Sequence, residues 1–257
     1  MWNTLAYNSR SWEEHIRVVI AAVTGEGTGT TFTGPIECHV RSAGCRPTGK
    51  GLWAGQDGYL AADEGAVYDG ELGWHSPGSA TDKLAVQVNM IFDNPVANPA
   101  PLTIGPTETI RCDSQAIFRP TKGGCVYLNA TENILEISAS DHSVTEAAKF
   151  IKEAQKKIHN HAGLFRVGRA LTRLTDRSLT RRNRRVACKG LRVRKSQSCD
   201  EYPFASTYQG AAMVPRVDFD SRAVNDAQNK KVGTYLSIFL LHLRIASKDS
   251  YYVDIAS

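Results

Sequence analysis

Residues 198–207 read SCDEYPFAST and directly follow the most basic part of this 257-residue chain. The stretch places two adjacent acids, Asp200 and Glu201, before an aromatic-proline-aromatic cluster. Positions 163–199 hold twelve Lys or Arg and a single acid, Asp176, although the net charge of the whole chain is only +5. Such a basic block favours a polyanionic partner, namely nucleic acid or a membrane surface. A solvated, partly mobile segment is the alternative that charge alone leaves open.

The sequence around these acids predicts the order strand, turn, strand, helix, strand. The acids lie on the first strand, and residues 216–220, RVDFD, are expected to form the second. Asn225 and Asp226 can cap a helix over about residues 227–243. Residues 248–255, KDSYYVDI, predict a closing strand. The residues expected to form the buried face of the helix are Val232, Leu236, Phe239, Leu240 and Leu243.

This order suits the hydrolysis of a phosphodiester bond. The reaction needs a base that deprotonates a water, and a divalent metal held by carboxylate or amide oxygens stabilises the leaving oxygen. Adjacent residues of a strand point to opposite faces, so one of Asp200 and Glu201 is expected to face the site. Adjacent acids on a surface strand are also common where they are merely solvated. The polar residues at the predicted helix start are Asn225, Asp226, Gln228 and Asn229.

Three motifs together resemble the NucA/NucB family of secreted bacterial deoxyribonucleases. They are RRNRRVAC, CDEYPFAST and QNKKVGTYLSIFLLHLRIASKDSYYV, in that order. The resemblance covers roughly residues 145–255. The positions that match the family's helix and C-terminal patterns are Asn229, Gly233, Leu236, Phe239, Arg244, Ile245, Asp249, Tyr251 and Val253.

The resemblance implies a ββα-metal, HNH-like nuclease that uses Mg²⁺ or Mn²⁺. It makes Asp200 the candidate general base and Glu201 a supporting or metal-shell residue. The family's metal-binding glutamate falls on Gln228, a neutral amide, so Asn229 and Asp226 are further candidate ligands. Gln228 leaves open an inactive, binding-only relative of the family.

The arginines upstream of the acids are candidate phosphate contacts. Cations placed beside phosphates add affinity without reading base sequence. The resemblance implies DNA as the partner, and RNA stays an alternative because phosphate contacts do not distinguish the two. The candidate nucleic-acid-binding residues are Arg181, Arg182, Arg184, Arg185 and Lys189.

The six cysteines fall into three pairs that are close in sequence, namely Cys38 with Cys45, Cys112 with Cys125, and Cys188 with Cys199. An even number in local pairs favours three disulfides and an oxidising, extracellular location, although six cysteines allow fifteen pairings. The early apolar run at residues 18–23 is too short for a signal peptide, and no membrane span is expected.

The first part of the chain reads as β-structure. Residues 83–92, KLAVQVNMIF, alternate apolar and polar positions, and the prolines within residues 94–106 indicate a loop or an extended edge. Ser143 and Glu146 form a capping-box pattern that predicts a helix to about residue 159. We therefore expect an α+β chain with a β-rich, sandwich-like domain over residues 1–140 and a nuclease domain over residues 141–257.

The function favoured by these features is metal-dependent endonucleolytic cleavage of DNA with little sequence preference. A non-catalytic nucleic-acid-binding protein is one alternative. Another is the nuclease tip of a larger secreted polymorphic toxin, which would have an immunity protein as a partner.

Overall fold

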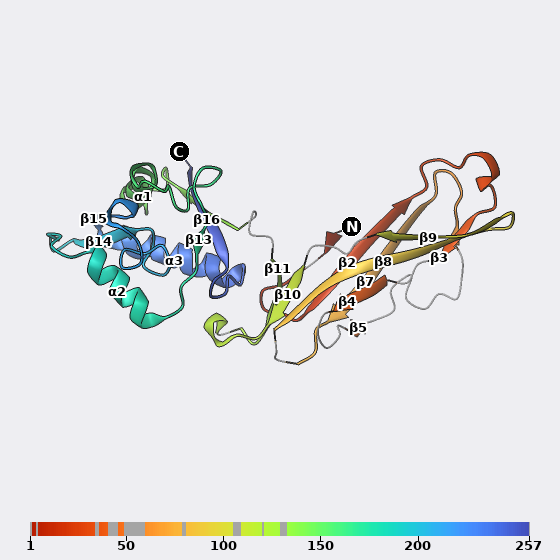
Figure 1. Cartoon of the computed structure of the whole chain (residues 1–257), viewed down its shortest axis with the longest axis horizontal. Helices are drawn as coiled ribbons and strands as arrows, with labels where there is room; N and C mark the ends of the chain where they lie inside the picture. Colours follow the sequence, from red (N-terminus) through yellow and green to blue (C-terminus); the bar gives the residue numbers. More distant parts are fainter. Residues whose placement is uncertain are drawn as a thin grey trace. The chain divides into compact units, whose positions relative to one another are not determined.

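The computed structural model describes residues 2–3, 5–33, 36–40, 46–48, 60–78, 81–104, 109–119, 121–128 and 133–256. The chain divides into two compact units, Met1–Leu128 and Asn129–Ser257 (Figure 1). This division lies before strand β12 (Ile134–Ser138), whereas the sequence suggested a boundary after residue 140. The difference arises because β12 pairs in parallel with the C-terminal strand β16 (Ser250–Ala256).

The N-terminal unit consists of two sheets of antiparallel strands. One sheet has the order β1-β2-β7-β5, with strands β1 (Trp2–Asn3), β2 (Ser11–Val19), β7 (Val67–His75) and β5 (Arg46–Thr48). The other has the order β11-β10-β8-β3-β6, and β4 and β9 also pair with β8. Its strands are β11 (Gly124–Tyr127), β10 (Ile110–Asp113), β8 (Asp82–Asn94), β3 (Thr31–Thr33), β6 (Leu60–Ala61), β4 (Ile36–Val40) and β9 (Ala97–Ile104).

The two sheets share one hydrophobic core. The alternating pattern of β8 buries Leu84 and Met90, which belong to the same cluster as Trp12 of β2 and Trp74 of β7. The proline-rich segment forms β9, and among the described strands β9 pairs with β8 alone. It is therefore an extended edge strand, which is where the missing N–H groups of proline are tolerated.

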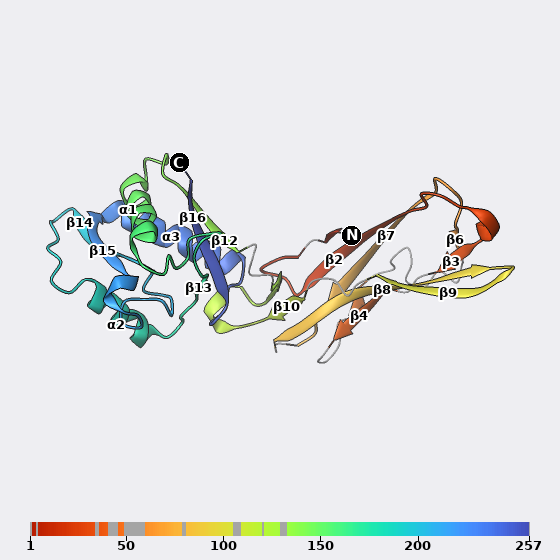
Figure 2. The same cartoon turned by 45° about the horizontal axis from the view of Figure 1, so that its top comes forward.

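The C-terminal unit has a three-stranded sheet of order β12-β16-β13 and a separate two-stranded hairpin. Figure 2 shows β12 and β16 side by side. The strand β13 is Leu171–Thr172, and the hairpin strands are β14 (Gln197–Tyr202) and β15 (Asp220–Asn225). The helices among the described residues are α1 (Thr145–Lys157), α2 (Arg177–Ala187) and α3 (Asp226–His242). Together the two units make a mixed chain of strands and helices, consistent with the α+β class.

Helix α1 forms where its sequence predicts, but the predicted capping box is wrong. Val144 occupies the N-cap position and makes no side-chain capping hydrogen bond. Asp141 accepts a hydrogen bond from the Ser143 N–H at 2.8 Å, so this amide is already satisfied locally. Glu146 instead contacts the first turn of α3, where the N–H of Asn225 donates to its carboxylate.

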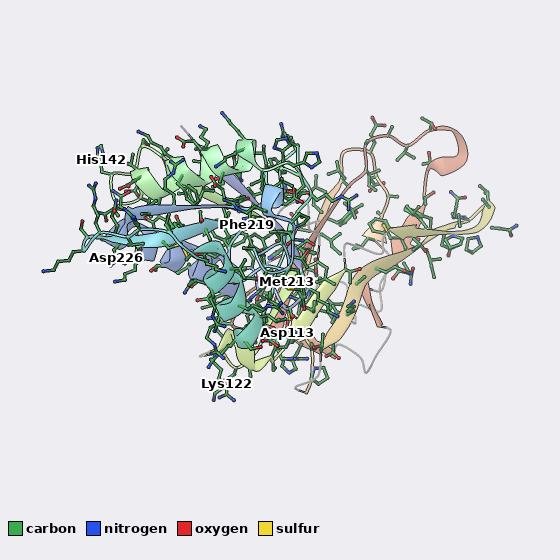
Figure 3. The ribbon with its side chains drawn as sticks, turned by 60° about the vertical axis from the view of Figure 1, so that its left-hand side comes forward. Asp113, Lys122, His142, Met213, Phe219 and Asp226 are labelled. Carbon is green, nitrogen blue, oxygen red and sulfur yellow. A yellow bond between two sulfur atoms is a disulfide. The ribbon has the colours of Figure 1, made fainter. Side chains whose placement is uncertain are left out.

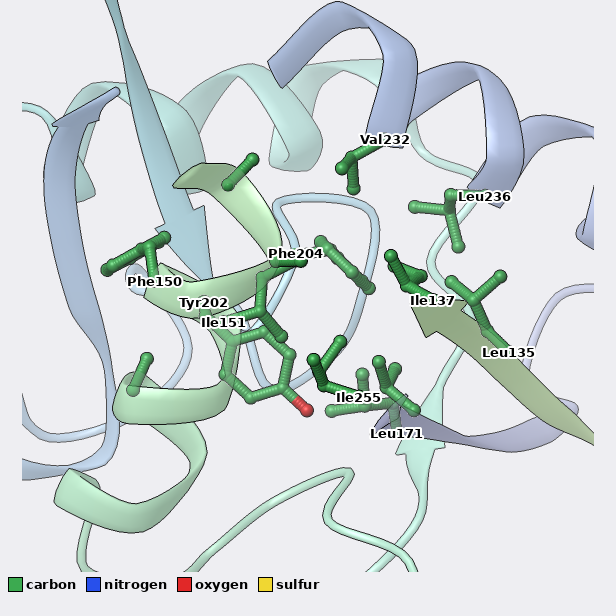
Figure 4. Packing of buried hydrophobic residues seen from close by; sticks show 14 of the residues in the cluster. Leu135, Ile137, Phe150, Ile151, Leu171, Tyr202, Phe204, Val232, Leu236 and Ile255 are labelled. Carbon is green, nitrogen blue, oxygen red and sulfur yellow. The ribbon is translucent and has the colours of Figure 1, made fainter. Parts of the chain in front are cut away.

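The core of the C-terminal unit lies between α1, α3 and the strands (Figure 4). Tyr202 is fully buried at the end of β14; its hydroxyl donates to the Ala162 carbonyl at 2.9 Å and accepts from Gln155 at 3.1 Å. A Cβ at Gly163 would lie 2.2 Å from this hydroxyl, so glycine is required there. The acid-bearing strand is thereby fixed to the core through the residue that follows Glu201. Other labelled members of the cluster are Leu135, Ile137, Phe150, Ile151, Leu171, Phe204, Val232, Leu236 and Ile255.

Within the part of the chain that the structure describes, no helix has the length and apolar character needed to cross a membrane.

Candidate active site

The predicted order of strand, strand and helix is present as β14, β15 and α3. The two strands pair antiparallel from Gln197 opposite Asn225 to Tyr202 opposite Asp220, which places Asp200 opposite Arg222. The second strand begins later than predicted, because residues 216–218 form a short 3-10 turn. Helix α3 follows β15 without a linker. Its first turn contacts the first strand, β14, through the hydrogen bonds of Asn229.

The start of α3 is fixed by two asparagines. Asn225 is the N-cap, and its side chain accepts a hydrogen bond from the Gln228 N–H at 3.1 Å, as the sequence predicts. Asn229 donates from its amide to Ser198 Oγ and to the Cys199 carbonyl, each at 3.1 Å. Asn229 therefore ties the first turn of α3 to β14, directly beside Asp200.

A pocket of about 550 Å³ brings the predicted acids and part of the predicted helix start together. Both Asp200 and Glu201 line it, although alternation along the strand suggested that only one would. The pocket extends from α2 to α3 past β14, so both acids reach it. Its other polar lining residues include Asp226, Asn229, Arg184, Lys230, Thr180, Ser198 and Ser206, of which the sequence pattern had not indicated Lys230, Thr180, Ser198 and Ser206.

Asp200 is buried, and one of its two carboxylate oxygens has no compensating hydrogen bond among the described residues. The residue is only 5% exposed, and this oxygen is its side-chain Oδ2. Burial, and then the negative charge of Glu201, raise the pKa of Asp200 to about 8. An unsatisfied buried oxygen in a pocket is unusual in folded proteins and marks a group that is available to a cation or to a water.

Glu201 faces helix α2. Its Oε1 lies 3.4 Å from Nε of Arg184, and its side chain is almost fully buried whereas that of Arg184 is 67% exposed. Burial raises the pKa of Glu201 against the opposing effect of the Arg184 guanidinium. The pair places the exposed positive charge of Arg184 in the pocket lining, beside Glu201.

A disulfide joins Cys188 and Cys199, as predicted, and its sulfurs line the pocket. The two sulfurs and a carboxylate oxygen of Glu201 lie within 4.8 Å of one another. Because the sulfurs are bonded to each other, they are not thiolate metal ligands. The bond instead connects the end of α2 to the strand that carries the acids.

The second predicted disulfide, Cys112–Cys125, joins β10 to β11 in the N-terminal unit. The third predicted pair, Cys38 with Cys45, lies outside the described residues.

Two of the three predicted metal ligands on α3 line the pocket, and the third does not. Asn229 lines it, and so does Asp226, whose Oδ2 lies 2.6 Å from Lys230 Nζ; this contact lowers the pKa of Asp226. Gln228 lies outside the lining, because its carboxamide contacts the start of α1. The neutral residue at position 228 therefore does not remove a ligand from the pocket.

The predicted nucleic-acid-binding residues divide into two groups. Arg184 lines the pocket, whereas the other four are exposed on or just after α2 and do not line it: Arg181, Arg182, Arg185 and Lys189. Asn183, which sequence reasoning missed, is fully buried between them; its amide nitrogen donates to the carbonyls of Ala205 and Thr207. These hydrogen bonds hold residues 205–207, which follow the two acids in sequence, against helix α2.

The pocket offers a donor set that suits a hard divalent cation. Carboxylate and amide oxygens are the ligands that Mg²⁺ and Mn²⁺ prefer, and the lining provides Asp200, Glu201, Asp226 and Asn229. The unsatisfied Oδ2 of Asp200 is the observation that fits such an ion best, because this oxygen can accept a hydrogen bond from a water that the ion holds.

Comparison with known proteins gives one family. No curated protein matches the chain. Residues 166–254 match the model of the family Deoxyribonuclease NucA/NucB. The matched range includes α2, β14, β15 and α3, and with them every residue named above as lining the pocket. The pocket-bearing part of the chain is therefore similar to the deoxyribonuclease NucA/NucB family.

Proposed function

We propose that the C-terminal unit is a metal-dependent endonuclease that hydrolyses DNA phosphodiester bonds with little sequence preference. The family match supports a deoxyribonuclease. The observation that carries the proposal is the pocket that joins two buried acids, an amide of the following helix and an exposed arginine. Acids without an adjacent cation would repel a phosphate, and a cation without acids would only bind it.

The residues that would hold Mg²⁺ or Mn²⁺ are Asn229 and Asp226, with Glu201 in support. When bound, the ion supplies positive charge that stabilises the leaving oxygen and the negative charge that develops on the phosphate oxygens in the transition state. Asn229 is held in place by its contacts to Ser198 and Cys199, so its carbonyl oxygen is oriented before any ligand arrives. This preorganisation is typical of sites that bind cations through few protein ligands.

Asp200 is the candidate general base. Its pKa of about 8 lies close to neutral pH, where a base is both partly ionised and strong enough to accept the proton of a water. Its carboxyl group faces the pocket and has an oxygen without another hydrogen-bond partner among the described residues. Arg184 would bind the scissile phosphate at the pocket wall, and Glu201 holds Arg184 there.

The lack of sequence preference follows from the kind of contact that α2 offers. Its exposed arginines are expected to neutralise phosphates along a strand, and phosphate contacts carry no information about base sequence. The two disulfides among the described residues are consistent with action in an oxidising, extracellular compartment.

A plasmid-nicking assay tests this function. The full chain should convert supercoiled plasmid to open-circular and linear forms with Mg²⁺ or Mn²⁺, and EDTA should stop it. Asp200→Asn should lower the rate at least about 100-fold, because it removes the proton acceptor. A well-folded wild-type protein that remains inactive with every divalent metal tried would overturn the proposal, as would full activity of the Asp200→Asn variant.

A further inference from the structure

The first turns of α1 and α3 are joined by a reciprocal pair of hydrogen bonds. The backbone N–H of Glu146 donates to Oε1 of Gln228 at 2.6 Å. The backbone N–H of Asn225 donates to Oε2 of Glu146 at 3.2 Å. In an ordinary capping box both partners belong to one helix, whereas here each helix receives its acceptor from the other. We call this pair the Glu146–Gln228 clasp.

The clasp offsets an unfavourable arrangement of helix ends. The first N–H groups of a helix lack intrahelical acceptors, and the helix dipole adds partial positive charge at this end. The N-termini of α1 and α3 lie beside each other, so these positive ends would repel. The carboxylate of Glu146 belongs to the first turn of α1 and accepts a hydrogen bond from the N–H of Asn225 at the start of α3, so it interacts favourably with both ends.

The clasp is continuous with the candidate active site. Gln228 is followed directly by Asn229, which bonds to β14 beside Asp200, and Asp226 also lines the pocket. The amide nitrogen of Gln228 also points toward the His142 carbonyl, at 3.5 Å. Figure 3 shows His142 and Asp226 at the same end of the C-terminal unit. The start of α3 is thus held from the strand side by Asn229 and from the α1 side by Gln228.

We propose that Gln228 is a positioning residue. Through the clasp with Glu146 it holds Asn229 and Asp226 at the pocket, and it is not itself a metal ligand. The activity readouts of this inference rest on the proposed nuclease function. The inference also accounts for an amide at a position where a carboxylate was expected: a glutamate there would place a second carboxylate against Glu146.

Exchanging the two side chains gives a direct test. Gln228→Glu keeps an oxygen that can accept from the Glu146 N–H, but it removes the amide donor to the His142 carbonyl and places a second carboxylate beside that of Glu146. The repulsion should displace the start of α3 and lower the cleavage rate roughly three- to tenfold. Adding Glu146→Gln to that variant restores one carboxylate and one amide in exchanged positions. The double variant should therefore recover to within about twofold of the wild type, and the two substitutions should be strongly non-additive.

Metal binding provides a readout that does not depend on turnover. Calorimetric titration of Mn²⁺ into the full chain should give Gln228→Glu an affinity no higher than that of the wild type. If Gln228 faced the metal, the new carboxylate would tighten Mn²⁺ binding at least about tenfold and raise activity, whichever residue occupied position 146. That result would overturn the inference, and so would a double variant that fails to recover, whether through inactivity or through misfolding.

A charge-matched control separates the clasp from general charge effects. Glu136→Gln removes the same charge from an exposed carboxylate on β12 and should leave the rate of the Gln228→Glu variant unchanged when the two are combined. The proposed function fails if wild-type protein does not cleave DNA. The clasp fails if wild-type protein cleaves DNA but the exchange shows no recovery, so the two failures are distinguishable.

Discussion

Asp200 combines burial, a neighbouring acid and an oxygen that lacks a hydrogen-bond partner among the described residues. Each of these features disfavours its ionised form, so the folded protein holds a proton at Asp200 that a solvated aspartate would release. A group of this kind reduces stability at neutral pH unless a cation compensates it. The same residue therefore lowers the free energy of unfolding at neutral pH and is suited to proton transfer.

The pH dependence of stability should reveal this cost. The pKa of Asp200 is about 8 in the fold and 3.8 in its reference state. Between these values the folded state binds the extra proton, so stability falls as pH rises from about 4 to 8. We expect Asp200→Asn to melt at least about 3 °C above the wild type at pH 8, with the difference vanishing near pH 4. Thermal melts in EDTA would measure it, and a pH-independent difference would contradict the assignment.

A second residue-scale prediction separates Arg184 from the other arginines of α2. Arg184 lines the pocket beside Glu201, whereas Arg181 is exposed on the same helix and does not line it. Arg184→Ala should lower kcat at least about tenfold, because it removes positive charge at the reacting phosphate. Arg181→Ala should mainly raise KM and reduce its dependence on salt. Equal effects of the two variants on kcat would show that Arg184 has no special role.

At the scale of elements, the site depends on how α2, β14 and α3 are held together. Asn229 ties α3 to β14, and Asn183 ties α2 to the segment after the acids. The Cys188–Cys199 disulfide adds a covalent link between α2 and β14 within the pocket wall. Arg184 lies on α2 and Asp200 on β14, so this link also fixes the distance between the candidate phosphate-binding and proton-accepting groups.

Removing that disulfide should therefore impair catalysis as well as stability. The double variant Cys188→Ser, Cys199→Ser is expected to lose about 1–3 kcal/mol of unfolding free energy. Its cleavage rate should fall about tenfold or more. The matched control is Cys112→Ser, Cys125→Ser, which removes the disulfide of the other unit. Denaturant titration and plasmid nicking of both variants would measure the effects. Equal cleavage rates for the two double variants would contradict the proposed role.

At the scale of the whole molecule, the described residues of each unit have a main hydrophobic core of their own. The cluster of the C-terminal unit contains residues between Leu135 and Ile255, whereas that of the N-terminal unit contains residues between Trp12 and Cys125. The pocket residues all come from the C-terminal unit. Among the described residues, the core cluster and the pocket of the C-terminal unit are thus made by side chains of that unit.

Residues 129–257 produced alone should therefore fold and nick plasmid DNA. We expect cooperative thermal unfolding of this fragment and a cleavage rate within about threefold of the full chain, because a unit of this size with its own core is typical of an independent domain. Calorimetry and plasmid nicking would measure the two properties. An unfolded fragment, or a folded one without activity, would show that the N-terminal unit contributes to the site.

Sequence reasoning reached those features of the fold that depend on residues close together along the chain. The alternation of β8, the Asn225 cap of α3, the closing strand β16 and the two described disulfides were all predicted. Capping and periodicity arise from contacts between residues a few positions apart, so the pattern contains the information. The same applies to Asp200 and Glu201, whose place beside a basic segment is visible in the sequence.

Only the tertiary structure decided which side chains meet across segments that are distant in sequence. It paired β12 with β16, turned Gln228 away from the pocket toward Glu146, and selected Arg184 from a set of similar arginines. These outcomes depend on how α1, α2 and α3 pack around the hairpin, and a local pattern contains no record of that packing. The sequence by itself thus determined the elements and the chemistry available, whereas long-range packing determined which groups share the pocket.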